Sequence, residues 1–151
     1  MAAVAVKYPA FKELATEVLV VSTDTINSHH EWQEKVLSRM VPGGARFPLI
    51  SDSSGTIGSL YGVYDAEKKR EMRSHFIIDP DGIIQSVEMI ASSVGRNVSE
   101  ILRQLRALIH SRSTGELMPC GWEPGKPTLP DTHSPDAEPR PWESWKPRNA
   151  F

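Results

Sequence analysis

The stretch Phe76-Ile-Ile-Asp-Pro-Asp-Gly-Ile-Ile-Gln-Ser-Val87 carries the clearest structural signal in this sequence. Two apolar runs flank Asp-Pro-Asp-Gly, which is typical of a tight turn because proline presets φ and glycine accepts a positive φ. The pattern predicts a hairpin with strands at 76–79 and 83–87. A second strand is predicted at 17–22, where Glu17-Val-Leu-Val-Val-Ser22 forms the short, β-branched apolar run of a strand covered on both faces.

Helical signals alternate with these strands. Ser28 and Glu31 have the form of a capping box and predict a helix over 28–40, with an inward stripe of Trp32, Val36 and Met40. We expect Trp32 to pack in the core. A short strand is predicted at 47–51, and Ile57, Leu60 and Tyr61 suit a short helix after Asp52.

Both ends of this region are also expected to be helical. Asn97 and Glu100 form a second possible capping box, and an apolar stripe follows it, which predicts an amphipathic helix over 97–111. At the start, Pro9 would break a longer helix, so we expect the ordered helix to open near Pro9 and residues 1–7 to be frayed. The order of elements predicts an α/β fold, a mixed sheet with helices on both faces.

Composition excludes several classes of protein. The chain has 151 residues, with 17 basic and 19 acidic side chains and a net charge of −2, so it lacks the basic excess typical of proteins that bind nucleic acid or anionic lipid. Cys120 is the only cysteine, which excludes a disulfide scaffold. Because we find neither a run long enough to span a membrane nor a cationic leader, we expect a cytoplasmic protein with a reduced thiol.

The amino-acid composition of the chain changes near residue 112. Residues 113–151 hold eight of the 12 prolines and three of the four tryptophans. We therefore predict a folded domain at 1–112 and a non-helical arm at 113–151. Such arms are often free tails, but exposed aromatic rings are costly in water, so we favour an arm that packs on a partner subunit.

Six blocks of residues resemble a known family in their order and spacing. They are Glu17-Val-Leu-Val-Val-Ser-Thr-Asp24, Phe47-Pro-Leu-Ile-Ser-Asp52, Leu60-Tyr-Gly-Val63, Arg73-Ser-His-Phe-Ile-Ile-Asp-Pro-Asp-Gly82, Val94-Gly-Arg-Asn97 and Gly121-Trp-Glu-Pro-Gly125. The family is that of the peroxiredoxins of the alkyl hydroperoxide reductase C and thiol-specific antioxidant group. The resemblance implies a thioredoxin-like fold and a thiol-dependent reduction of hydrogen peroxide and organic hydroperoxides. It implies no metal or organic cofactor, and assembly into dimers or rings of dimers.

The same resemblance assigns site residues. Arg73 matches an arginine that stabilises the reactive thiolate and the polarised peroxide bond, and Arg96 matches a second arginine of that pocket. The alternative from spacing alone is that both arginines pair with surface carboxylates such as Glu71 or Glu100. The family's reactive cysteine lies in a Pro-x-x-x-Thr-x-x-Cys loop that would precede residue 1, so the resemblance predicts an N-terminally truncated domain without its nucleophile. The strand leading to that loop would lie between the strands at 17–22 and 73–79.

The cysteine and the histidines are the remaining side chains that could react or bind a metal, and each has a purely structural alternative. Cys120 stands two positions after Met118, which occupies the place of the family's resolving cysteine, so Cys120 is either a redox thiol or an inert small side chain. The five histidines, His29, His30, His75, His110 and His133, show no spacing of a known metal site, and we predict no metal.

Three hypotheses follow from the sequence. In the first, the chain is a peroxiredoxin that is inactive alone because its reactive cysteine is absent. In the second, it is a non-catalytic protein that associates with full-length peroxiredoxin subunits. In the third, Met1 is a mis-assigned start and the gene encodes the missing loop.

Overall fold

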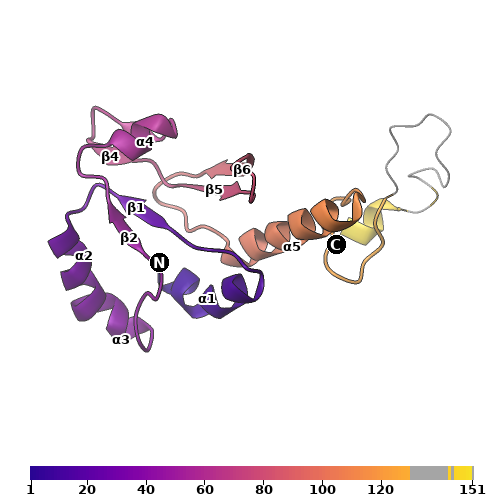
Figure 1. Cartoon of the computed structure of the whole chain (residues 1–151), viewed down its shortest axis with the longest axis horizontal. Coiled ribbons are helices and arrows are strands. Elements are labelled where there is room, and N and C mark those ends of the chain that lie inside the picture. The colour runs from indigo at the N-terminus through magenta and orange to yellow at the C-terminus, as the bar shows by residue number, and fades with distance from the viewer. Residues whose placement is uncertain (130–142, 144, 151) are drawn as a thin grey trace. The chain divides into compact units, whose positions relative to one another are not determined.

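The computed structural model describes residues 1–129, 143 and 145–150, and the chain divides into two compact units, Met1–Val98 and Ser99–Phe151 (Figure 1). The first unit holds α1 (Ala2–Glu13), β1 (Val20–Ser22), α2 (Ile26–Trp32), a π-helical segment (Gln33–Leu37), α3 (Ser38–Met40), β2 (Leu49–Ser51), α4 (Thr56–Leu60), β3 (Tyr64–Asp65), β4 (Arg70–Glu71), β5 (Ser74–Ile78) and β6 (Ile84–Met89). Helix α5 (Val98–Thr114) and the 3₁₀ helix Pro147–Ala150 make up most of the regular structure of the second.

The strands of the first unit form three separate pairs. β1 pairs with β2 in parallel, while β3 with β4 and β5 with β6 are antiparallel. Helices and strands mix as an α/β fold requires, but the described strands do not join into one sheet. Among the described strands β1 and β5 do not pair with each other, and the strand that the resemblance places between them stays a prediction. The pair β3–β4 was not predicted, because two-residue strands leave no periodic signal.

The predicted hairpin is β5–β6, and its turn explains why the sequence signal was so clear. The carboxylate Oδ1 of Asp79 accepts hydrogen bonds from the N–H groups of Asp81 and Ile83, both at 2.9 Å. Gly82 has a φ of +81°, which an L side chain rarely adopts. The turn is thus closed by its own residues and requires little from the rest of the fold.

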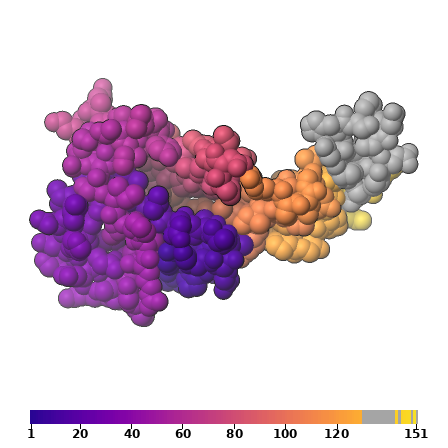
Figure 2. All heavy atoms as spheres, viewed as in Figure 1, coloured from indigo at the N-terminus to yellow at the C-terminus, as the bar shows by residue number. Residues whose placement is uncertain are grey.

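Helix α1 begins at Ala2, so the expectation that residues 1–7 are frayed was wrong. Pro9 lies inside the helix. A proline there removes one helical hydrogen bond, but Ala5 is buried and joins Leu37, Val41 and Phe47 in one apolar cluster. Figure 2 shows α1 packed side by side with the rest of the first unit. Tertiary burial of the first two turns therefore outweighs the local cost of proline.

The predicted helix over 28–40 was correct at its end but wrong at its start and, for Val36 and Met40, in its inner face. Thr25 caps α2, with its side chain accepting a hydrogen bond from the N–H of Ser28 at 3.2 Å, so the helix begins at Ile26. The π-helical segment adds a residue to one turn and rotates the apolar stripe. As a result Leu37 is 0% exposed, whereas Val36 is 43% exposed and Met40 63%. Trp32 is half-buried and packs against the cluster, as expected.

Helix α5 and the turn after it form the core of the second unit. Leu102 and Leu105 are buried on the predicted stripe, and Trp122 is 2% exposed. The backbone carbonyl of Trp122 accepts a hydrogen bond from Arg103, and its indole N–H donates to the carbonyl of Lys126 at 3.0 Å. α5 continues to Thr114, three residues beyond its predicted end.

Several expectations concern the C-terminal arm. Those on His133, Trp142 and Phe151 lie outside the described residues. The boundary at residue 112 and the packing of the arm on a partner stay predictions. Within the part of the chain that is described, no helix combines the length and the apolar character that crossing a bilayer demands.

Candidate functional site

Arg73 and Arg96 come from two loops of the first unit. Arg73 occupies the bend before β5 and is exposed, and Arg96 lies half-buried in the segment before α5. Burial, together with the positive charges of Arg96 and then Arg73, lowers the pKa of the amino group of Met1. Both guanidinium groups are therefore close enough to the amino group of Met1 to act on it electrostatically.

Arg96 is held by the backbone of β5. Its Nη1 donates a hydrogen bond to the carbonyl oxygen of Ser74 at 2.6 Å. Desolvation by burial, followed by repulsion from Arg73, lowers the pKa of Arg96, while the negative charge of Glu88 opposes that shift. Because Arg73 and Arg96 repel each other, an anion bound near both side chains would be stabilised.

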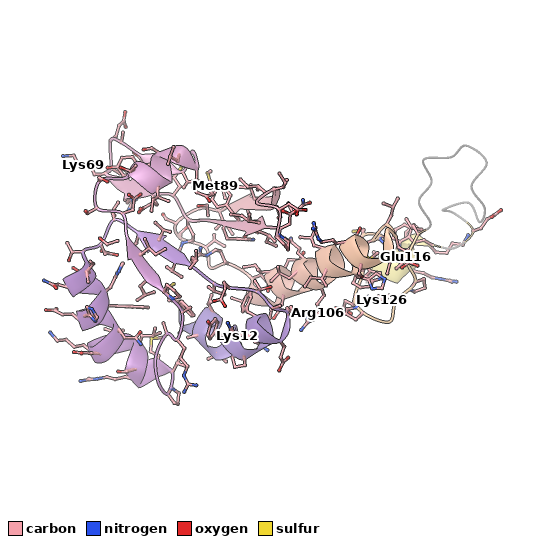
Figure 3. All side chains as sticks on the ribbon, viewed as in Figure 1. Lys12, Lys69, Met89, Arg106, Glu116 and Lys126 are labelled. Carbon is pink, nitrogen blue, oxygen red and sulfur yellow. The ribbon has the colours of Figure 1, made fainter. Side chains whose placement is uncertain are left out.

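A histidine and a carboxylate lie beside the arginines. His75 and Glu88 are direct cross-strand partners in the β5–β6 pair, and the His75 Nδ1 is 3.2 Å from the Glu88 Oε2. Neither ring nitrogen of His75 makes a hydrogen bond of good geometry, although both are buried. The contact with Glu88 is thus Coulombic. In Figure 3, Met89 marks the end of β6, the residue after Glu88.

We expect His75 to stay neutral at lower pH than an ordinary histidine. Desolvation lowers the pKa of His75, Arg96 lowers it further, and Glu88 raises it. Because the folded state disfavours the proton, the contribution of His75 to stability is present above about pH 6.5 and is lost as pH falls through the lowered pKa. A ¹H–¹³C NMR titration of the imidazole should show this midpoint, moved down in Glu88→Gln and up in Arg96→Met. A His75 midpoint that is the same in the parent and in both variants would contradict an electrostatic interaction of His75 with Glu88 and Arg96.

The two carboxylates that were the alternative partners of Arg73 and Arg96 make other contacts. Glu100 forms a two-point ion pair with Arg103, with Nε to Oε2 at 2.7 Å. Glu71 instead accepts a hydrogen bond from the N–H of Thr23 at 2.9 Å. Among the described residues, neither Arg73 nor Arg96 has a carboxylate within ion-pair distance.

Cys120 belongs to the second unit, so the three predicted site residues are divided between the two units. The thiol is exposed. Hydrogen bonding to Glu100 is the main cause that raises the pKa of Arg103, and Cys120 adds a smaller electrostatic contribution. Cys120 therefore lies near a guanidinium group that Glu100 already neutralises.

Sequence reasoning missed part of this site. Spacing alone did not indicate that the Ser74 carbonyl would hold Arg96, nor that Glu88 would face His75. The contact between Glu88 and His75 could have been found from the sequence, because the position of the Asp-Pro-Asp-Gly turn fixes which residues of the hairpin face each other. Chemically, the positive charges of Arg73 and Arg96 can hold an anion, or stabilise negative charge that develops on oxygen.

Comparison with known proteins gives the family. Residues 1–87 match the model of the AhpC/TSA family, and residues 107–144 match that of the C-terminal domain of 1-Cys peroxiredoxin. The chain belongs to the AhpC/TSA family of peroxiredoxins. It is 52% identical over 131 residues to the selenocysteine-containing peroxiredoxin PrxU of Peptoclostridium acidaminophilum, covering 85% of this chain and 64% of that protein.

Other relatives agree with this assignment. Alkyl hydroperoxide reductase C of Pseudomonas aeruginosa is 35% identical, with 81% of this chain and 64% of the relative covered. The reduced 2-Cys peroxiredoxin of Plasmodium vivax superposes with a TM-score of 0.78 at 30% identity, covering 84% of this chain and 65% of that one. This peroxiredoxin therefore has the predicted thioredoxin-like fold. The chain spans just under two thirds of the length of these relatives.

Proposed function

We propose that this chain contributes two arginines, Arg73 and Arg96, to a thiol-dependent peroxidase site that reduces hydrogen peroxide and organic hydroperoxides. The observation that carries the proposal is the anchoring of Arg96 to the Ser74 carbonyl at 2.6 Å, where burial and the positive charge of nearby Arg73 lower the pKa of Arg96. Membership of the family supports it. Antioxidant defence in a reducing, cytoplasmic compartment is the role that fits such chemistry.

The proposed reaction uses the positive charge in two ways. A chalcogenolate attacks one oxygen of the hydroperoxide, forming a sulfur–oxygen or selenium–oxygen bond as the O–O bond breaks. The departing oxygen leaves as hydroxide or alkoxide and takes up a proton. Arg73 and Arg96 stabilise the attacking anion and the charge that develops on the departing oxygen. A thiol reductant then attacks the sulfenic or selenenic acid, releases water and restores the nucleophile through thiol exchange.

Cys120 is not the proposed nucleophile, because the guanidinium group that the described residues place near it, that of Arg103, is already paired with Glu100. By resemblance the nucleophile lies ahead of α1. The relative that contains selenocysteine makes a selenolate as suitable a candidate as a thiolate. Reading the gene in frame upstream of the Met1 codon, for a cysteine codon or for a UGA that specifies selenocysteine, tests this directly. Upstream sequence with neither codon would contradict this proposal.

The 151-residue chain on its own is expected to show no peroxidase turnover above the uncatalysed reaction of thiol with peroxide. Consumption of hydrogen peroxide with dithiothreitol or thioredoxin as reductant measures this, with Cys120→Ser as the matched variant. Equal and negligible rates are expected for both proteins. Steady turnover that disappears in Cys120→Ser would make Cys120 the nucleophile and overturn the assignment.

A second candidate function is association with full-length peroxiredoxin subunits without catalysis. The edges of β1 and β5 that no described strand covers favour it, because such edges recruit other strands. Dimers or rings of dimers formed through the arm belong to the same proposal. Purification of the chain from its native source, followed by mass spectrometry, distinguishes the two functions: a stoichiometric longer peroxiredoxin is expected only for the second.

A further inference from the structure

His75 places an ionisable ring among the charges around Arg96. It faces Glu88 directly across the β5–β6 pair, with 3.2 Å between the His75 Nδ1 and the Glu88 Oε2. The preceding residue on β5, Ser74, holds Arg96 through its carbonyl oxygen. A carboxylate and a guanidinium group therefore act on the same imidazole from two different segments, β6 and the loop before α5.

His75 acts on its surroundings through its charge and not through contact with a ligand. Its side chain is 14% exposed, and both ring nitrogens are buried without a hydrogen bond of good geometry. An anion that arrives from solvent can contact the exposed Arg73 and the half-buried Arg96, here called the two-arginine site. The nitrogen atoms of His75 are not accessible to such an anion.

The charge that Glu88 presents to Arg96 depends on the state of His75. While His75 is neutral, Glu88 offsets part of the positive charge of Arg96, and its attraction opposes burial and Arg73, the two causes that lower the pKa of Arg96. Once His75 gains a proton, the carboxylate of Glu88 lies 3.2 Å from a positive ring, which neutralises it. The local charge then rises by one elementary charge, so an anion at the two-arginine site is held more strongly.

The ionisable groups around this cluster come from several segments. Glu88 lies on β6, Arg96 in the segment before α5, and Arg73 in the bend before β5. The amino group of Met1 also belongs to these surroundings, because burial, then Arg96 and then Arg73 lower its pKa. Two of these groups act on His75 itself: after burial, which lowers the pKa of His75 most, Glu88 raises it and Arg96 lowers it.

We propose that His75 is a further positioning residue of the two-arginine site, which acts through Glu88: protonation of His75 cancels the charge of Glu88 and makes the site bind anions more tightly. The inference rests on the proposed function, because it concerns the same two arginines, and it adds regulation by pH to that site. Because the pKa of His75 is lowered, the tighter state forms as pH falls below about 6.5, the ordinary value for a histidine. The site then stabilises a thiolate or a departing oxyanion most strongly in acid, where thiolates are otherwise lost to protonation.

The first test measures this coupling in the parent chain and needs no substitution. Sulfate is the probe, because it stays a dianion throughout the titration, and sodium chloride at the same ionic strength is the reference. If a proton and an anion favour each other's binding, the factor is the same in both directions. Saturating sulfate should therefore raise the NMR titration midpoint of His75 by about 0.7 pH units, equivalent to about fivefold tighter binding of the anion. A midpoint that sulfate leaves unchanged overturns the proposal.

The second test measures the Kd of sulfate from the ¹H–¹⁵N signal of the Arg96 Nε–H, at pH values above and below the His75 midpoint. In the parent the Kd should be about fivefold lower below the midpoint. His75→Gln cannot gain the proton, so this difference should be lost, and the pH dependence that remains is the contribution of the Met1 amino group. His30→Gln removes an exposed histidine of α2 and is the matched control, which should behave as the parent does. Equal pH dependence in the parent and in His75→Gln contradicts the proposal.

Two further variants separate the route of the effect from the site itself. Glu88→Gln should lower the Kd for sulfate above the His75 midpoint about as far as protonation does in the parent, and an unchanged Kd would contradict the role of Glu88. Arg73→Met should raise the Kd. A Kd that stays at the parent value in Arg73→Met would overturn the two-arginine site, and with it both the proposed function and this inference. A Kd that rises in Arg73→Met but does not depend on His75 overturns this inference alone.

Discussion

Arg73→Met is expected to lower kcat/KM for hydrogen peroxide by about 10²–10³-fold in a peroxidase-competent form of the protein, the range found when one donor to a developing oxyanion is removed. Such a form carries a cysteine-bearing peroxiredoxin segment fused ahead of Met1. The effect should be large because Arg73 lies near enough to Arg96 to lower its pKa further than burial alone does, so that both positive charges act on the same departing oxygen. Stopped-flow measurement of the oxidation step gives the rate constant without interference from the thiol reductant.

Arg39→Met is the matched control for this substitution. Arg39 is an exposed arginine on α3, and the change removes the same charge from the first unit. Its kcat/KM should stay within about threefold of the parent, because the interaction of distant exposed charges is screened by salt. An equal loss in both variants would mean that net charge, and not the position of Arg73, determines the rate. A loss of less than threefold in Arg73→Met would remove Arg73 from the site.

Leu37→Ala is expected to lower the free energy of unfolding by about 2–5 kcal/mol, the cost of deleting a fully buried leucine side chain. Leu37 is 0% exposed and lies in the cluster that Ala5, Val41 and Phe47 complete. The loss should include the first turns of α1, which pack on this cluster and tolerate Pro9 only because of it. Urea denaturation followed by tryptophan fluorescence measures the change, since Trp32 packs against the same cluster.

Val36→Ala provides the control on the neighbouring residue. Val36 is 43% exposed, so its truncation should cost less than about 1 kcal/mol. The sequence pattern predicted the reverse order, because an uninterrupted α-helix would turn Val36 inward with Trp32. The pair of variants therefore tests the phase of the π-helical segment. A larger loss for Val36→Ala would show that the helix keeps the regular spacing in solution.

Elements with local causes could be predicted well. The hairpin at 74–89 follows from a turn whose Asp79 and Gly82 satisfy it internally, and the stripe of α5 follows from a regular period of apolar residues. The order of motifs also indicated the family and its fold. The start of α1 could not be predicted, since the penalty for Pro9 is a local property and the burial of Ala5 is not.

The candidate site, like the fold, could be predicted from the sequence only in part. The sequence predicted the types and the order of the site residues, because Arg73 and Arg96 stand in recognisable motifs. The anchoring of Arg96 on the Ser74 carbonyl and the repulsion between Arg96 and Arg73 arise only in three dimensions. Sequence determines contacts between near neighbours through turn chemistry and periodicity. Contacts between distant segments depend on which surfaces are buried together, and only the folded structure decides that.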